Sequence, residues 1–170
     1  KYKRDVYEAQ FLIGYRGFVH LVMSDSPAPS VYGRIVYAGE EFRISEGTQH
    51  HLIHVPSLER RNLKDYIGAY AVVIYKDGTP PDFEWMPKVD IEKVRAFSKA
   101  TGPASPWQTW TEEMIKKTPL RRLCKRLKLS PEVIAASVRD EYRELGYEHG
   151  RPEPRQIMMP RRASELPPSQ

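Results

Sequence analysis

A cluster of basic residues between Met114 and Lys128 is the part of the sequence whose chemistry is most specific. It contains seven cations and no acid: Lys116, Lys117, Arg121, Arg122, Lys125, Arg126 and Lys128. The whole chain has a net charge of +5, so the rest of it is slightly acidic and the basic character is concentrated here. Because lysine and arginine neutralise backbone phosphates, this cluster favours a nucleic acid as the partner.

A helix through this segment would separate charged from apolar residues. Helical spacing predicts a cationic face formed by Lys117, Arg121, Lys125 and Lys128. The opposite face is apolar and can pack on the protein; it is formed by Leu120, Leu123, Cys124 and Leu127. Like charges four residues apart repel, and a polyanion along the row would relieve that repulsion. The alternative is a surface helix whose cations pair with acids from elsewhere in the fold. Pro119 cannot donate a backbone hydrogen bond to residue 115, so we expect a break there, with Thr118 capping the restart.

Two shorter features, a pair of tryptophans and a glycine-flanked arginine, offer further nucleic-acid contacts. Trp107 and Trp110 precede the basic segment, and indole rings beside cations can stack on the bases of a single strand. Anchoring of the helix to the core explains each tryptophan equally well. In Gly14-Tyr-Arg-Gly17 the glycines allow a close backbone approach and Arg16 can bind a phosphate, although a tight turn also explains the glycines.

Histidines at positions 50, 51 and 54 raise the question of a metal site. On a strand His50 and His54 share one face and His51 lies on the other, and no carboxylate pattern completes a recognised site. Structural use of these histidines is therefore favoured, and we expect no metal site.

Acidic residues give the main alternative function. Glu40, Glu41 or Asp90 could bind Mg²⁺ in a phage nuclease or a nuclease-associated protein. No set of carboxylates in the sequence has a spacing specific for that chemistry. None of the ten glycines belongs to a G-x-x-x-x-G-K-[ST] loop, so we expect action without ATP and without any other cofactor.

Length and composition describe the chain as a whole. With 170 residues, 40% of them hydrophobic and 29% charged, the chain can form one compact core and is not disordered throughout. No apolar run is long enough for a membrane span, and the single cysteine, Cys124, excludes an internal disulfide. We expect Cys124 to be buried on a helix and the protein to lie in a reducing, intracellular compartment. The chain begins at Lys1 and is expected to be a piece of something longer.

The elements that must position these residues change type along the chain. Strands are predicted at 6–13, 31–37, 42–44, 65–75 and 83–86, with a short helix from Phe18 to about residue 24. We expect one hairpin between 31–37 and 42–44, and a second across the Asp77-Gly78 turn. Helices are predicted from Val89, over 111–128, and from the Ser130-Pro131 cap to Gly146.

These elements together predict an α+β fold. An antiparallel sheet with hairpins comes from the first half and packs with helices mainly from the second half. We expect one core domain over residues 1–146, with its amino-terminal part apparently missing, and a flexible proline-rich tail over 147–170.

A set of short motifs occurs in a characteristic order. They are Gln10-Phe-Leu-Ile-Gly-Tyr-Arg-Gly17, Val36-Tyr37, Glu41-Phe42, His54-Val-Pro56, Ala69-Tyr-Ala-Val72, Lys76-Asp-Gly78, Ile91-Glu-Lys93, Ser98-Lys-Ala100, Ser105-Pro-Trp107, Met114-Ile-Lys-Lys-Thr118 and Arg121-Arg122. Each motif is weak alone, but the ordered set resembles the RecT family of phage single-strand annealing recombinases, over about residues 8–130.

The resemblance implies a protein that is not an enzyme. It implies a protein that coats single-stranded DNA, anneals it to a complementary strand without ATP, and acts in phage-type recombination as a ring or helical homo-oligomer. The resemblance implies that the product is annealed duplex DNA, and that an exonuclease or a host single-strand-binding protein is a further partner. It places the protein in the bacterial cytoplasm, with no membrane association. The DNA-binding residues implied by position, together with Trp107 from the reasoning above, are Lys116, Lys117, Arg121, Arg122, Lys125, Arg16 and Lys99.

Overall fold

The computed structural model describes residues 13–24, 30–48, 50–59, 61–98, 102 and 105–144, with side chains up to residue 142. The strands are β1 (Ser30–Tyr37), β2 (Glu41–Ser45), β3 (His51–Val55), β4 (Tyr66–Ile74) and β5 (Asp82–Pro87). The helices are α1 (Tyr15–Met23), α2 (Lys88–Phe97), α3 (Pro106–Thr109), α4 (Thr111–Cys124) and α5 (Pro131–Glu144), with a short 3₁₀ turn at Leu63–Asp65. Strands precede most of the helices, so the predicted α+β class is confirmed.

The main sheet is antiparallel and has three strands in the order β1-β4-β5. β4 is buried along most of its length because it is central in the sheet and both of its faces are covered. The turn between β4 and β5 contains Gly78 at φ +84°, a backbone conformation that glycine adopts without steric cost. The predicted hairpin across Asp77-Gly78 is therefore confirmed, with Val72 opposite Phe83.

The strands β2 and β3 form a separate two-stranded hairpin. The predicted hairpin between 31–37 and 42–44 is wrong, because β1 pairs along its length with β4 and β2 pairs with β3. β2 has apolar residues on only one face, and that face lies on the main sheet: the Phe42 ring lies 4.5 Å from Trp85 and 5.8 Å from Tyr70. Packing on the sheet thus took precedence over the short local turn at residues 38–40.

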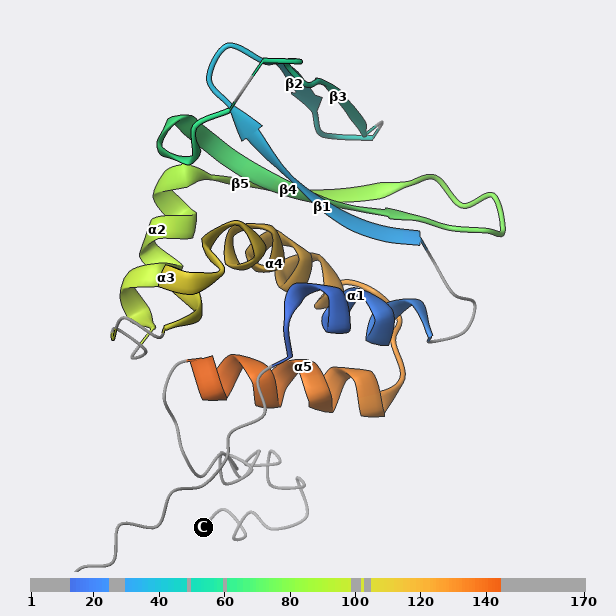
Figure 1. Ribbon diagram of the computed structural model, residues 1–170. Coiled ribbons are helices and arrows are strands. Elements are labelled where there is room, and N and C mark those ends of the chain that lie inside the picture. Colours follow the sequence, from blue (N-terminus) through green and yellow to red (C-terminus); the bar gives the residue numbers. More distant parts are fainter. Residues whose placement is uncertain are drawn as a thin grey trace, which may run out of the picture.

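The fold is layered. Figure 1 shows the main sheet with the β2–β3 hairpin on one side and α4 and α1 on the other, while α5 lies beyond α1 and α4. The helices α2 and α3 lie together at one end of the sheet. α4 contacts all three strands of the main sheet, so its residues are placed directly against the strand layer.

The helix α4 contains Pro119 and is nevertheless continuous from Thr111 to Cys124. The expected break at Pro119 is wrong, because Pro119 and Leu120 are fully buried and packing holds the helix together where one backbone bond is lacking. Its predicted end at Lys128 is also wrong. The amides of Lys125 and Arg126 bond to the carbonyls three residues earlier, which tightens the chain into a turn before α5.

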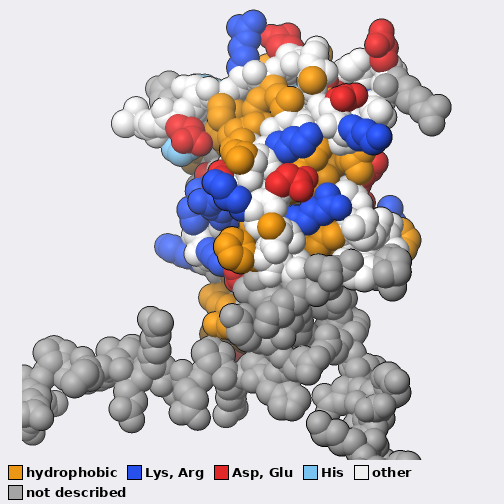
Figure 2. All heavy atoms as spheres, turned by 90° about the vertical axis from the view of Figure 1, so that its left-hand side faces the viewer, with side chains coloured by type: hydrophobic (Ala, Val, Ile, Leu, Met, Phe, Trp, Pro, Cys, Tyr) orange, Lys and Arg blue, Asp and Glu red, His pale blue; other side chains and the backbone are white. Residues whose placement is uncertain are grey.

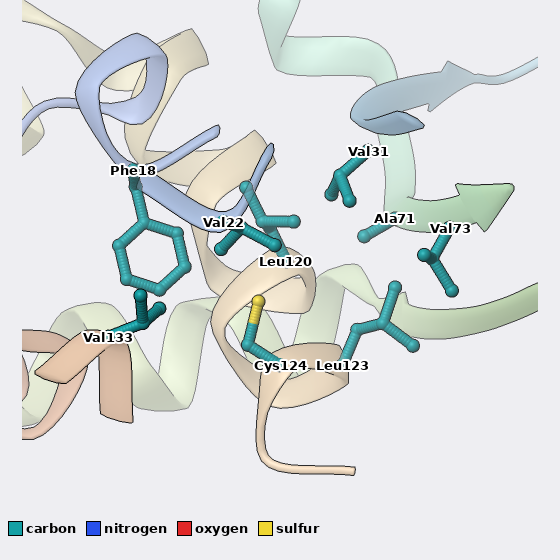
Figure 3. Close-up of a cluster of buried hydrophobic side chains, with 9 residues drawn as sticks. All are labelled: Phe18, Val22, Val31, Ala71, Val73, Leu120, Leu123, Cys124 and Val133. Atoms are coloured by element: carbon teal, nitrogen blue, oxygen red, sulfur yellow. The ribbon is translucent and has the colours of Figure 1, made fainter. Parts of the chain in front are cut away.

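A first core cluster lies between α1, α4, α5 and the sheet. Figure 3 shows its side chains converging from five elements: Phe18, Val22, Val31, Ala71, Val73, Leu120, Leu123, Cys124 and Val133. The predicted burial of Cys124 on a helix is confirmed. Burial raises the pKa of the Cys124 thiol to about 12, so this thiol is protonated at neutral pH.

Two further clusters complete the core. One joins α2, α3 and α4 to the sheet around Ile91, Trp107 and Ile115. The other lies on the opposite face of the sheet, under the β2–β3 hairpin, around Val36, Tyr70 and Phe83. Both faces of the sheet are therefore buried.

The observed start of α5 agrees with the start predicted from the sequence. The amide of Val133 donates to the Ser130 hydroxyl, and Pro131 is the first helical residue, as predicted. The predicted strand at 6–13, the stop at Gly146 and the tail at 147–170 lie outside the described residues, apart from Ile13, which is not in a strand. Among the helices of the described segments, none is both long and apolar enough to cross a membrane.

Candidate nucleic-acid interface

The cations of α4 and the turn after it are largely neutralised within the protein. Six of the seven lie within ion-pair distance of an acid: Lys116 with Glu113, Lys117 and Arg121 with Asp140, Arg122 with Glu84, Lys125 with Glu141, and Arg126 with Glu84 and Asp82. Most of these acids belong to β5 and α5. The expectation of an unpaired cationic row is therefore wrong, and the alternative, pairing with acids from elsewhere in the fold, is confirmed.

Lys117 and Arg121 lie in the interior, between α4 and α5. Lys117 Nζ is 2.6 Å and Arg121 Nη2 is 3.0 Å from Oδ2 of Asp140, and the side chains are 3%, 9% and 1% exposed. The other carboxylate oxygen of Asp140 accepts the backbone N–H of Ile13 at 2.9 Å. Asp140 therefore joins α5 to α4 and to Ile13, two residues before the start of α1.

Arg122, Lys125 and Arg126 lie at the surface, each about half exposed. Arg126 also donates to the carbonyl of Phe83 at 2.8 Å, which fixes the turn after α4 against β5. These cations are accessible to solvent, but each forms an ion pair with a carboxylate. On the face that Figure 2 shows, lysine and arginine side chains likewise lie beside acidic and apolar ones.

A groove of about 550 Å³ runs beside β1 and combines cations with aromatic rings. Its walls come from β1, β3, β4, α4 and the segment that follows β3: Tyr32, Arg34, Ile35, Tyr37, His54, Pro56, Arg61, Tyr70, Glu112 and Lys116. We call it the β1 groove. It contains three cations from three distant parts of the sequence, and one acid, Glu112.

Each cation of the β1 groove stacks on a tyrosine ring. Arg34 lies 5.7 Å from the Tyr32 ring centroid, and Arg61 lies 5.5 Å from that of Tyr37. Lys116 Nζ lies 5.3 Å from the Tyr15 centroid. Such contacts attract the cation to the ring face and restrict its position. The groove therefore presents its charges at defined places.

A buried carboxylate organises the wall that Arg61 and His54 form. Glu40 is 1% exposed and accepts three hydrogen bonds, from Tyr37 N–H (2.8 Å), His54 Nε2 (3.0 Å) and Ser57 N–H (3.0 Å). Its fourth partner is Arg61, whose Nε forms an ion pair with it at 3.0 Å. Burial alone would raise the pKa of Glu40, but these donors outweigh burial and hold the pKa below its usual 4.5. Glu40 is therefore ionised at neutral pH.

His54 connects this carboxylate to Tyr70. Because an ionised carboxylate only accepts, Nε2 of His54 carries the hydrogen, while Nδ1 lies 3.1 Å from the Tyr70 hydroxyl. Burial raises the pKa of Tyr70 to about 12, so its hydroxyl stays neutral in the groove. The preference for structural use of His54 agrees with these contacts.

The edge of β1 is partly capped by side chains. The Gly33 N–H donates to the Tyr15 hydroxyl at 2.6 Å, and the Tyr37 N–H donates to Glu40. A Cβ at Gly33 would lie 3.0 Å from the Lys116 carbonyl, a tight contact that would push α4 away from the strand. Since two of its amides are already bonded, this edge is less open to another strand.

A second cavity of about 610 Å³ lies next to the groove, between the start of α1 and the α3–α4 junction. Its lining includes Arg16, Trp110 and Glu113. Glu113 pairs with Lys116 of the β1 groove at 2.6 Å, so the two hollows adjoin at this ion pair. Arg16 is exposed here, which agrees with an accessible position for this predicted site residue.

The two tryptophans have different environments. Trp107 is 3% exposed, and Arg95 lies 5.9 Å from its ring, so this side chain anchors α3 in the core. Stacking of a base on Trp107 is not possible in this conformation. Trp110 is 67% exposed and presents its indole at the second cavity. Lys99, another predicted contact, lies outside the described residues.

The acids of the nuclease alternative do not converge. Glu40 is occupied by the four partners described above, Glu41 pairs with Arg43, and Asp90 pairs with Lys93 on α2. Within the described ranges there is no group of three or more His, Cys, Asp or Glu side chains that could hold a metal ion.

Sequence reasoning missed Arg34, Arg61 and the tyrosines of the groove. Arg34 has no cation near it in the sequence, and the Arg60-Arg61 pair lies in a separate segment, so no local cluster contained both of these groove cations. The signal available in the sequence was the Tyr32-Gly-Arg34 alternation, which places an aromatic and a cationic side chain on the same face of β1.

Comparison with known proteins gives two matches. A model described as the RecT family matches residues 1–155. Protein RecT of Escherichia coli (strain K12) is 41% identical over 132 residues, which are 78% of this chain and 48% of that protein. The chain thus spans about half the length of the curated relative that it matches.

Proposed function

This chain belongs to the RecT family, and from that premise we propose that it binds single-stranded DNA in the β1 groove and anneals it to a complementary strand. The observation that carries the proposal is the composition of the groove: Arg34, Arg61 and Lys116 beside Tyr32, Tyr37 and Tyr70. Cations can contact successive phosphates, and aromatic faces accept any base. Binding in such a groove is tolerant of sequence and sensitive to salt.

The predicted contact residues take different roles in this proposal. Lys116 contacts phosphate directly in the groove, and Arg16 extends the path into the adjoining cavity. Arg122 and Lys125 are peripheral contacts, because neither lines the β1 groove or the adjoining cavity. Lys117 and Arg121 act indirectly by fixing α4 and α5 through Asp140.

The remaining properties of the proposal concern the assembled protein. Annealing needs no ATP and no other cofactor, and no DNA strand is cut. Subunits repeat along the strand as a ring or helical homo-oligomer. An exonuclease or a host single-strand-binding protein is the expected partner in phage-type recombination in the bacterial cytoplasm. Support for these properties comes from family membership.

Successive addition of two complementary labelled oligonucleotides, without ATP, tests this function. We expect faster duplex formation than without protein, and large assemblies by light scattering. Strands of unchanged length in Mg²⁺ are expected, whereas shortened strands would favour the nuclease alternative. Absence of both annealing and single-strand binding would overturn the proposal.

A triple variant locates the activity in the groove. Arg34→Ala, Arg61→Ala and Lys116→Ala together should abolish most annealing. A matched triple variant, Arg43→Ala, Lys93→Ala and Arg139→Ala, removes the same charge from exposed positions outside the groove lining. We expect this control to retain most of the activity. Equal losses in both variants would indicate a dependence on net charge rather than on the groove.

A further inference from the structure

Glu40 is a carboxylate placed where simple electrostatics would disfavour it. It is almost fully buried directly behind the part of the groove wall that carries the cation Arg61. A negative charge near a bound phosphate chain repels it, and a buried charge is retained at a desolvation cost unless it is well paired. The contacts of Glu40 indicate what this charge contributes in return.

Arg61 is held on three sides. Its Nε forms an ion pair with Glu40 Oε1 at 3.0 Å, its Nη2 donates to the Ser57 carbonyl at 3.0 Å, and its guanidinium stacks on Tyr37. Its side chain is 38% exposed and lines the β1 groove. A guanidinium has five N–H donors, more than its contacts with Glu40 and Ser57 use, so it can also bind a phosphate.

Glu40 also fixes the segment that carries Arg61. The same carboxylate accepts from Ser57 N–H, four residues before Arg61, and from His54 at the end of β3. Glu40 also accepts from the backbone N–H of Tyr37, and Arg61 stacks on the ring of this same tyrosine. One carboxylate therefore sets the position of the guanidinium, of the ring beneath it and of the backbone that leads to it.

We propose that Glu40 is a positioning residue for strand binding, which holds Arg61 in its phosphate-binding orientation before DNA arrives. This inference rests on the proposed function of the β1 groove. An unconstrained arginine loses side-chain freedom when it binds a phosphate, whereas a fixed arginine has already lost it. The free energy gained from this preorganisation exceeds the repulsion between Glu40 and the strand.

The sign of one measurement separates this role from a simple charge effect. Glu40→Gln removes a negative charge next to the groove, so electrostatics alone predicts tighter binding. Positioning predicts weaker binding, because a neutral amide places N–H groups against donors and releases Arg61. The full chain is titrated into a labelled oligothymidylate at fixed salt, and the dissociation constant is measured by fluorescence anisotropy.

We expect Glu40→Gln to weaken binding about 3- to 10-fold. Glu59→Gln is the matched control: it makes the same charge change at an exposed residue between Ser57 and Arg61. This control should bind as tightly as the wild type, or slightly more tightly. Binding by Glu40→Gln that equals or exceeds that of the Glu59→Gln protein would overturn the inference.

A double-mutant cycle excludes a merely structural role. In the absence of Arg61 there is nothing left to position, so Glu40→Gln should cause no further loss in an Arg61→Ala background. Additive losses would show that Glu40 acts through general stability and would overturn the inference. Thermal unfolding verifies that each variant is folded at the assay temperature.

Arg61→Lys gives an independent test if Glu40→Gln fails to fold. It keeps the positive charge but replaces the planar guanidinium with a single ammonium group, which cannot reproduce both the ion pair with Glu40 and the hydrogen bond to Ser57. We expect weaker binding than in the wild type, and unchanged binding would overturn the inference. If the wild-type protein itself does not bind the oligothymidylate, the proposed function fails first, and the two failures are therefore distinguishable.

Discussion

Lys117 Nζ on α4 lies 2.6 Å from Oδ2 of Asp140 on α5, and both side chains are almost completely buried. Arg121 meets the same oxygen at 3.0 Å. Two cations from the most basic segment of the sequence therefore join helices in the interior. Part of the charge that suggests a phosphate partner in the sequence serves in the structure to dock α5.

Replacement of Asp140 should strongly destabilise the protein. Asp140→Asn leaves two buried cations without their shared carboxylate, and removal of one partner of a buried ion pair costs about 3–5 kcal/mol. Chemical denaturation with urea measures this loss. The control Glu141→Gln breaks the exposed pair with Lys125 and should cost about 0–1 kcal/mol. Similar small losses for both variants would contradict the buried triad.

Glycine substitutions at positions 33 and 17 should have opposite effects. Gly33→Ala places a methyl group against the Lys116 carbonyl and pushes α4 away from β1, at a cost of about 1–3 kcal/mol. Gly17→Ala is exposed within α1, meets only ordinary contacts, and should stabilise the helix by up to about 1 kcal/mol. Thermal and urea unfolding of the two variants checks the order. A neutral Gly33→Ala would refute the close approach of α4 to β1.

Acidification should remove the stabilisation that Glu40 provides. The pKa of Glu40 in the folded protein is lower than its ordinary value of 4.5, so the ionised form favours folding. Its contribution is complete above that ordinary value and is lost as the pH falls through the lower, folded-state pKa.

The wild type and the Glu40→Gln variant should therefore differ in free energy of unfolding by a constant amount above about pH 5, and by less below about pH 4. Urea denaturation across this pH range measures the difference. A difference that stays the same or grows at low pH would contradict the assigned hydrogen bonds.

Cys124 should be unreactive in the folded protein. With the pKa of its thiol raised to about 12, the thiolate fraction at pH 8 is on the order of 10⁻⁴, and the packed core shields it further. A thiol-specific chromogenic disulfide should react slowly with native protein and rapidly after addition of denaturant. Fast reaction under native conditions would contradict the packing of α4.

The fold was largely predictable because its signals are local. The Asp77-Gly78 turn, the apolar run of β4 and the Ser130-Pro131 cap each act through neighbouring residues. The pairing of β1 was not predictable in this way. β1 pairs with β4 across some 30 residues, and this pairing depends on burial of both faces of the sheet.

The site was less predictable because its geometry depends on distant partners. Asp82, Glu84 and Asp140 neutralise cations that lie 19 to 44 residues away, and no local pattern indicates such pairs. Conversely, Arg34 and Arg61 are separated in the sequence and meet only because the β2–β3 hairpin folds over the sheet. Of the cations predicted from the charge cluster, Lys116 lines the β1 groove, whereas Lys117 and Arg121 are buried against Asp140.

The salt dependence of single-strand binding tests the central claim most directly. The dissociation constant for a labelled oligothymidylate is measured from low to moderate salt for the wild type and for the Arg34→Ala, Arg61→Ala, Lys116→Ala variant. We predict a steep slope of log Kd against log salt concentration for the wild type. In the triple variant this slope should be lower by about 2, because each lost phosphate contact lowers it by roughly 0.7. The Arg43→Ala, Lys93→Ala, Arg139→Ala control should keep the wild-type slope. An unchanged slope in the groove variant would contradict the account.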